Sequence, residues 1–208
     1  MNIGIIGAAG RIGSHLAGQA LAEDAVVRGL CLPHDRPKVR HPRFSLVTGD
    51  ARNVEQVRQT IVGKDCVVLA VGSYCIDSPH TLHTESVRAT VAAMRQADVR
   101  RLVAILGSGI LDHRSGMPLG CVQRLDTPTA WLEDYLAAYE FLSTVQDVDW
   151  TLVCPSLMSD STPQGQYRVK ANHLPEGGRH IEAGDVADFI LRELKAREFD
   201  RQRVGIAY

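Results

Sequence analysis

The stretch NIGIIGAAGRIG, residues 2–13, decides the fold because it joins a strand pattern, a glycine turn and the start of a helix. Its apolar run ends at Ile6, and glycines follow at positions 7, 10 and 13. The first glycine permits a tight turn, the second admits a phosphate against the backbone, and the third lets the helix pack on the strand. The free N–H groups of such a helix attract anions. The spacing predicts a dinucleotide loop formed by Gly7, Gly10, Arg11, Ile12 and Gly13.

The rest of the chain alternates strand-length apolar runs with amphipathic helical patterns. Some runs, such as VVLAV at 67–71 and LVAIL at 102–106, are continuous, as in strands covered on both faces. The alternation predicts an α/β fold with a doubly wound parallel sheet (Rossmann), and residues 1–208 as one domain with a small C-terminal elaboration. We expect strands at 2–6, 26–32, 44–47, 66–71, 102–106, 150–154 and 203–206, helices near 11–22, 53–62, 80–97, 128–146 and 185–197, and long loops at 33–43 and 155–181.

Composition excludes several classes of partner. The formal net charge of −1 over 208 residues argues against binding nucleic acid or an anionic membrane through bulk electrostatics. No apolar run reaches the length of about 18 residues that a membrane span needs, and no basic region precedes the first strand as in a signal peptide. The five cysteines are odd in number and lack a CxxC spacing, so a disulfide framework is not expected. We therefore expect a cytoplasmic protein, either a monomer or a homodimer.

The end of the second strand bears on the choice between NAD and NADP. Asp35 lies near the distance expected of a carboxylate that bonds the ribose 2′-hydroxyl of NAD. Arg36, Lys38 and Arg40 follow it, and Arg11 adds a cation inside the glycine loop. These cations favour the 2′-phosphate of NADP, with Arg36 as its partner, while NAD stays possible. The alternative interpretation is a solvated basic loop.

The ends of the next three strands carry small or polar residues. Asp50 follows the third strand and could bond adenine, or this turn could instead cap the next helix through Asn53. The fourth strand ends in AVGS, residues 70–73, where small side chains let a cofactor lie across the sheet edge. The fifth ends in LGSGI, with Ser108 at the carboxyl edge. Because parallel strands end at one edge, these residues are expected to share one site.

Ordered motifs along nearly the whole chain resemble a known group. They are GAAGRIG at 7–13, the block from Val47 to Ser73, the block from Val87 to Gly109, CPSLMSD at 154–160 with GQYRV at 165–169, and IEAGDVADFIL at 181–191. With these motifs the chain resembles the atypical short-chain dehydrogenases/reductases, and among them the biliverdin/flavin reductases and the NAD(P)H-flavin reductase-like proteins.

The resemblance implies a pyridine dinucleotide along the carboxyl edge of the sheet. It implies hydride transfer from NAD(P)H to a flavin-like, quinone-like or small carbonyl acceptor, with Ser108 facing the nicotinamide. A water molecule or Tyr135 would supply the proton. The implied neighbours of the remaining cofactor are Asp50 and Ala51 at adenine, Val71, Gly72 and Ser73 at the ribose, and Cys154, Pro155, Ser156 and Leu157 beyond the nicotinamide.

Two departures from that group keep other functions open. A gapless match places Gly107 where the group often has serine, so the role of Ser108 requires a slip of one residue. The wider superfamily pairs a tyrosine with a lysine four residues later, but here Tyr135 is followed by Tyr139. A non-catalytic NADP(H) sensor similar to NmrA-like regulators is the alternative, and a nucleotide-sugar epimerase is a third, weaker one.

Histidines offer further candidate groups of lower specificity. His80 and His83 form an HxxH pattern, but no third ligand at metal-site spacing accompanies them, so we interpret them as structural or solvated residues. Asp112 and His113, just after the fifth strand, could move a proton, although a loop histidine without a role is the simpler interpretation.

Overall fold

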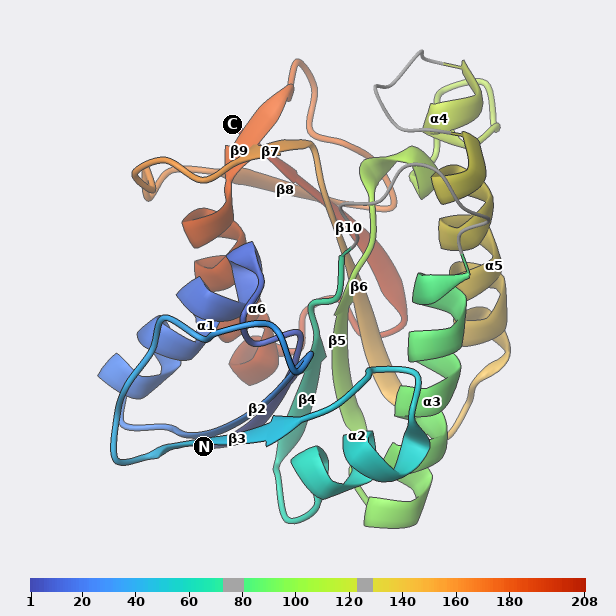
Figure 1. The fold of residues 1–208 in the computed structure, drawn as a ribbon. Helices are drawn as coiled ribbons and strands as arrows, with labels where there is room; N and C mark the ends of the chain where they lie inside the picture. Colours follow the sequence, from blue (N-terminus) through green and yellow to red (C-terminus); the bar gives the residue numbers. More distant parts are fainter. Residues whose placement is uncertain (73–80, 123–128) are drawn as a thin grey trace.

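A large, mostly parallel sheet forms the centre of the molecule (Figure 1). The computed structural model describes residues 1–72, 81–122 and 129–208. The strand order is β3-β2-β1-β4-β5-β6-β10-β8, and all neighbours pair in parallel except β8, which is antiparallel to β10. The strands are β1 (Asn2–Ile6), β2 (Val26–Cys31), β3 (Phe44–Thr48), β4 (Cys66–Leu69), β5 (Arg101–Ile105), β6 (Asp149–Pro155), β8 (Arg168–Ala171) and β10 (Gln202–Ala207).

Helices cover both faces of this sheet, which confirms the predicted doubly wound arrangement (Figure 1). α1 (Arg11–Ala22) and α6 (Ala183–Ala196) pack on one face, around a core that includes Ile5 and Val204. α2 (Val54–Ile61), α3 (Leu82–Ala97) and α5 (Thr129–Thr144) pack on the other face, around Val67 and Leu152. Alternate residues of each strand face opposite cores, so the central strands are apolar throughout.

The segment 155–181, predicted as a loop, contains three short strands instead. β7 (Leu157–Ser159) and β9 (His180–Glu182) pair in parallel as a separate two-stranded sheet above α1 and α6, and β8 joins the edge of the large sheet (Figure 1). These strands have three or four residues and are only partly buried, so they carry no apolar run that sequence periodicity could detect. The short helices η1 (Ser108–Ile110) and α4 (Leu119–Val122) also lay outside the prediction.

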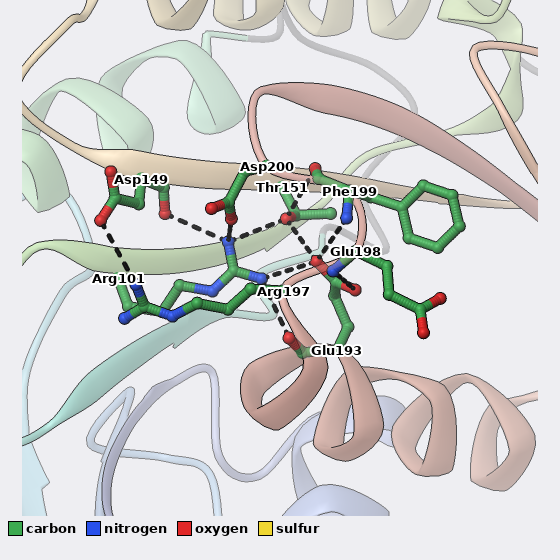
Figure 2. A network of polar contacts seen from close by, with 8 residues as sticks. All are labelled: Arg101, Asp149, Thr151, Glu193, Arg197, Glu198, Phe199 and Asp200. Carbon is green, nitrogen blue, oxygen red and sulfur yellow. Dashed lines mark hydrogen bonds and ion pairs between the residues drawn. The ribbon is translucent and has the colours of Figure 1, made fainter.

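A buried cation holds the amino-terminal edge of the sheet, opposite the edge that carries the glycine loop. Arg101, the first residue of β5, is 1% exposed. Its guanidinium donates to the Glu193 carboxylate at 2.8 Å and to the Asp200 carboxylate at 2.7 Å (Figure 2). It also donates to the Thr151 hydroxyl of β6 at 2.9 Å. Figure 2 shows strands β5 and β6 joined in this way to the end of α6.

Glu193 is also buried, and its carboxylate accepts hydrogen bonds from backbone N–H groups as well as from Arg101. The backbone N–H groups of Glu198 and Phe199 both donate to its carboxylate at 3.1 Å, just after α6 ends (Figure 2). A buried charge of either sign is therefore compensated by its partner and by hydrogen bonds. Removing Arg101 would leave the Glu193 carboxylate buried without its counter-charge.

The substitution Arg101→Ala should lower the free energy of unfolding by about 3–5 kcal/mol, because it leaves Glu193 buried without a counter-charge. Urea denaturation followed by circular dichroism measures this change. Arg95→Ala removes a guanidinium that pairs with Asp147 in solvent, and it should leave the denaturation midpoint almost unchanged. Equal midpoints for the two variants would contradict the role given to Arg101.

Candidate functional site

The glycine loop follows the carboxyl end of β1, beside the end of β4, and its backbone lies very close to its neighbours. Gly7 has a positive φ of +89°, and a Cβ added there would lie 2.4 Å from the Ala70 carbonyl oxygen. A Cβ at Gly13 would lie 2.1 Å from the Gly7 carbonyl oxygen. The Gly7 and Ala8 N–H groups both donate to the Leu30 carbonyl of β2. The loop therefore has no space for side chains at positions 7 and 13.

The N-terminus of α1 is open to an anion. Gly10 caps the helix without a side chain, and the first turn contains no acidic residue. The first hydrogen bond of the helix runs from the Ser14 N–H to the Gly10 carbonyl, and the N–H groups of residues 11–13 have no acceptor among the described residues. Unpaired N–H groups at the positive end of a helix bind phosphate. A glycine cradle beside them fits the pyrophosphate of a dinucleotide.

The next strand ends continue the same edge of the sheet. β4 ends at Leu69, two residues before the predicted end, and Val71 and Gly72 follow it. Gly72 is exposed, and a Cβ there would meet no atom within 4 Å. Ser73 lies outside the described residues. The described residues thus leave open space at the position of a Gly72 side chain.

At the end of β5, packing against Tyr135 explains why the serine is at position 108 and not at position 107. A Cβ on Gly107 would lie 2.5 Å from the Tyr135 ring, so a serine at position 107 would collide with that ring. Ser108 begins η1 directly afterwards and is half-buried. Its hydroxyl has no hydrogen-bond partner in the described part of the chain. The aromatic ring thus excludes a side chain at position 107, and the nearest serine is one residue later.

Tyr135 packs its ring against this strand end from α5. The residue is 8% exposed, and burial, together with the charge of Asp134, raises the pKa of its phenol to about 12. The phenol is therefore neutral at physiological pH. Tyr139, one turn later, faces the guanidinium of Arg203, whose carbon lies 4.5 Å from the ring centroid. That guanidinium also bonds the Asp112 carboxylate and the Ile110 carbonyl, which fixes the segment after Ser108.

The end of β6 contributes side chains of three different kinds. Cys154 is fully buried against the α5 face, and burial raises the pKa of its thiol to about 12. Pro155 ends the strand, and Leu157 is 69% exposed. Ser156 is 7% exposed, and its hydroxyl oxygen is buried without a partner among the described residues. An unsatisfied hydroxyl at this edge suits a ligand that brings a hydrogen-bonding group.

Two contacts that the sequence did not predict bring residues after β6 onto α1. The Arg11 guanidinium donates to the Met158 carbonyl at 3.1 Å, and the His15 ring lies 2.7 Å from the Asp160 carboxylate. The hydrogen bond from His15 lowers the pKa of Asp160, and the charges of Lys38 and Arg11 act in the same direction. Arg11 therefore stands beside the glycine loop among other cations. These partners are about 145 residues away in sequence, beyond any local pattern.

The loop after β2 places both candidate specificity groups near the strand end. Burial raises the pKa of the Cys31 thiol at the end of β2, the charge of Asp35 raises it further, and the charge of Arg36 opposes this. The Arg36 guanidinium donates to the carbonyls of Pro33 and Asp35 at 2.8 Å. Arg36 is exposed and has no carboxylate partner among the described residues, so an anion can reach it.

The predicted adenine position lies beside a shallow hollow of about 360 Å³ lined by Asp50, Arg52, Asn53 and Glu85. The Asp50 carboxylate pairs with the Arg52 guanidinium at 2.6 Å, and this bond lowers the pKa of Asp50. The Asn53 side chain caps α2 by accepting from the N–H groups of residues 55 and 56, so the predicted cap is confirmed. Ala51 is partly buried next to Asp50.

Other kinds of site are not found in the described ranges 1–72, 81–122 and 129–208. No group of three or more histidine, cysteine or acidic side chains there could hold a metal ion. None of the described helices is both long enough and apolar enough to cross a membrane. A second hollow of about 470 Å³, lined in part by Tyr167, Arg192 and Tyr208, lies beside α6 and away from the glycine loop.

Comparison with known proteins places this geometry in context. The model of the NAD(P)H-binding family matches residues 7–197. A solved structure from Burkholderia pseudomallei, which carries the provisional name of an exported protein, is 29% identical over the full length of both chains, with a TM-score of 0.83.

Two more distant structures share the fold. One is provisionally named an NADH-flavin reductase from Streptococcus pneumoniae, at 20% identity and a TM-score of 0.81, covering 100% of this chain and 99% of that one. The other is a wide-type short-chain dehydrogenase/reductase from Veillonella parvula in complex with NADP, at 18% identity and a TM-score of 0.78, covering 100% and 94%.

Two glycine-to-alanine substitutions within α1 should have opposite effects. Gly13→Ala places a methyl group against the Gly7 carbonyl, so it should lower the free energy of unfolding by about 1–3 kcal/mol and weaken dinucleotide binding. Gly18→Ala has open space and should raise stability by up to about 1 kcal/mol, because alanine favours the helix. Denaturation and titration with NADPH by tryptophan fluorescence measure both. Equal binding by the two variants would contradict the glycine cradle.

Proposed function

The chain belongs to the NAD(P)H-binding family, and on that premise we propose that it is an NADP(H)-dependent reductase. The carrying observation is the close-packed glycine loop beside the open N-terminus of α1, at the same sheet edge as Ser108 and Tyr135. When bound, the cofactor supplies a hydride at the nicotinamide ring. The acceptor is a flavin-like, quinone-like or small carbonyl molecule.

In this proposal, the protein's own groups bind the cofactor and orient it against the acceptor. The N–H groups at the start of α1 hold the pyrophosphate, and Val71 and Gly72 flank the ribose. The hydroxyl of Ser156, which is buried without a partner among the described residues, and the hydroxyl of Ser108 bond the carboxamide or the acceptor. Pro155, Leu157 and the backbone of Cys154 line the far side of the nicotinamide, and Asp50 and Ala51 lie at adenine. Such positioning accounts for much of the rate gain in hydride transfer.

Tyr135 is the proposed proton donor. It is protonated at physiological pH, and its ring lies against the strand end that precedes Ser108. The same raised pKa makes it a weak acid, an observation that also favours a non-catalytic NADP(H) sensor as the second candidate. Such a sensor would bind oxidised and reduced cofactor alike and turn over none of the acceptors.

The cations near the loop support a preference for NADP over NAD. Arg36 is exposed after the end of β2 without a carboxylate partner among the described residues. The charges of Lys38 and Arg11 both lower the pKa of Asp160, whose carboxylate bonds His15 of α1. A 2′-phosphate makes charge-assisted hydrogen bonds with such groups.

The substitution Arg36→Ala should weaken NADPH binding about tenfold, which corresponds to about 1.4 kcal/mol, and should leave NADH binding within twofold. Fluorescence titration measures both dissociation constants. Arg114→Ala, which removes an exposed pair with Glu176, should change neither of them. If Arg36→Ala weakens NADPH and NADH equally, the assigned contact with the 2′-phosphate is wrong.

Turnover with a panel of FMN, quinone and carbonyl acceptors tests the reductase itself. Tyr135→Phe should lower kcat for carbonyl acceptors about 100-fold, because the proton donor is lost. Ser108→Ala should lower it about three- to tenfold, because one neutral hydrogen bond is lost. NADPH binding by both variants should stay within twofold of the unsubstituted protein. Tight NADPH binding without turnover of any acceptor would favour the sensor instead.

A further inference from the structure

Arg52 lies between two carboxylates in the hollow at the predicted adenine position. Its Nε and Nη2 atoms donate to the two Asp50 carboxylate oxygens at 3.0 Å and 2.6 Å, and its backbone N–H donates to the same carboxylate at 2.8 Å. Its Nη1 atom lies 3.7 Å from the carboxylate of Glu85, in the first turn of α3. The Thr81 hydroxyl donates to the other Glu85 oxygen at 2.9 Å. Arg52 thus bridges the loop after β3 and the start of α3.

The backbone of Asp50 is fixed as well as its carboxylate. Its N–H donates to the Gln56 side chain at 2.8 Å, and its carbonyl accepts from the Asn53 N–H at 3.0 Å. Gly49, the preceding residue, is buried, and a Cβ there would lie 2.5 Å from the Gln56 Oε1 atom. Among the described residues, only Arg52 donates to the Asp50 carboxylate. This carboxylate is therefore held in one orientation before a ligand binds.

The hollow has an excess of negative charge. Asp50 and Glu85 contribute two carboxylates, and Arg52 contributes the one guanidinium among its lining residues. The bond from Arg52 lowers the pKa of Asp50, so the carboxylate is ionised and only accepts hydrogen bonds. A carboxylate offers about four acceptor positions, and Arg52 supplies three N–H donors, so capacity is left for a ligand. The Asp50 side chain is 34% exposed, and the hollow therefore suits a ligand group that donates and disfavours a phosphate.

Adenine and hypoxanthine differ at the atom that such a carboxylate would meet. The 6-amino group of adenine donates hydrogen bonds, whereas the 6-oxo group of hypoxanthine accepts them and carries a proton only on the neighbouring N1. A carboxylate held in one orientation bonds the amino group and repels the oxo group. A carboxylate that is free to turn reaches the N1–H instead and binds both bases. Fixing Asp50 therefore creates selectivity against the oxo base.

We propose that Arg52 is a positioning residue, which holds Asp50 so that the cofactor site accepts a 6-amino purine and rejects a 6-oxo purine. The inference rests on the proposed function, because it takes Asp50 to lie at adenine. Arg52 contacts Asp50 and Glu85, and it acts on the base through the Asp50 carboxylate. Lysine does not replace it, because an ammonium ion is a point charge without the planar fork that engages both carboxylate oxygens.

The binding of two dinucleotides tests this role. NADPH is compared with reduced nicotinamide hypoxanthine dinucleotide phosphate, which differs from it only in the 6-oxo purine, and tryptophan fluorescence gives both dissociation constants. The unsubstituted protein should prefer NADPH about tenfold, because a hydrogen bond to a charged group is lost with the oxo base. Arg52→Ala keeps the backbone bond at position 52 but frees the carboxylate otherwise, so the preference should fall to about two- to threefold.

Further variants separate positioning from charge. Arg52→Lys should leave the preference near that of Arg52→Ala, since the charge is kept and the fork is lost. Asp50→Asn should abolish the preference, because an amide accepts from the amino group through its oxygen and donates to the oxo group through its nitrogen. Arg58→Ala, which removes a guanidinium paired with Glu55 on α2, is the matched control and should keep the tenfold preference.

NMR of the unsubstituted protein gives a readout that needs no variant. Arg52 and Arg58 each donate from Nε to a carboxylate, so their Nε–H resonances can be compared directly. Addition of NADP⁺ should shift the Arg52 resonance, because the base binds the same carboxylate, and should leave the Arg58 resonance in place. An Arg52 resonance that NADP⁺ leaves unmoved would overturn the proposal even if Arg52→Ala did not fold.

The outcomes distinguish this inference from the proposed function. A tenfold preference that survives Arg52→Ala, or an unsubstituted protein that binds both dinucleotides equally, overturns the role of Arg52 while the reductase function stands. The expected selectivity in a protein that turns over no acceptor overturns the reductase function and supports Arg52 as a positioning residue in a sensor. A protein that binds neither dinucleotide overturns both.

Discussion

The close approach of three backbone segments at Gly7, Gly13 and Ala70 is the constraint on which the candidate site depends. The Gly7 carbonyl occupies the space of a Gly13 side chain, and the Ala70 carbonyl occupies that of Gly7. This contact places α1 directly behind β1 and aims its N-terminus along the sheet edge. The ends of β4 and β5 lie on the same edge because their strands are parallel, so the start of α1 and these strand ends share one candidate site.

Polar groups are paired at one edge of the sheet and left without partners among the described residues at the other. At the amino edge, Arg101 and Glu193 are both buried, and each charge is paired with the other within the protein. At the carboxyl edge, backbone N–H groups of α1 and the Ser156 hydroxyl have no partner among the described residues. A closed polar network holds the strands together, while an open one leaves groups available to a ligand. The stable edge thereby allows the other edge to stay unsatisfied.

Sequence periodicity predicted the parts of the fold that rest on local patterns. The glycine spacing, the buried strands and the amphipathic helices repeat within a few residues, so they could be read without coordinates. The partners of Arg11, His15 and Asp134 could not, because they lie 50 or more residues away and depend on packing. The shift from Gly107 to Ser108 likewise required the position of the Tyr135 ring. Long-range contacts supplied what local patterns lacked.

The contacts between α1 and the residues after β6 have a consequence for synthesis of the chain. The glycine loop is complete once residue 13 is made, but Met158 and Asp160, which bond Arg11 and His15, follow about 145 residues later. β10, which pairs with β6, follows later still in the sequence. A growing chain therefore carries an incomplete candidate site until the residues near 160 have been made, and a bound cofactor can stabilise these contacts only after that point.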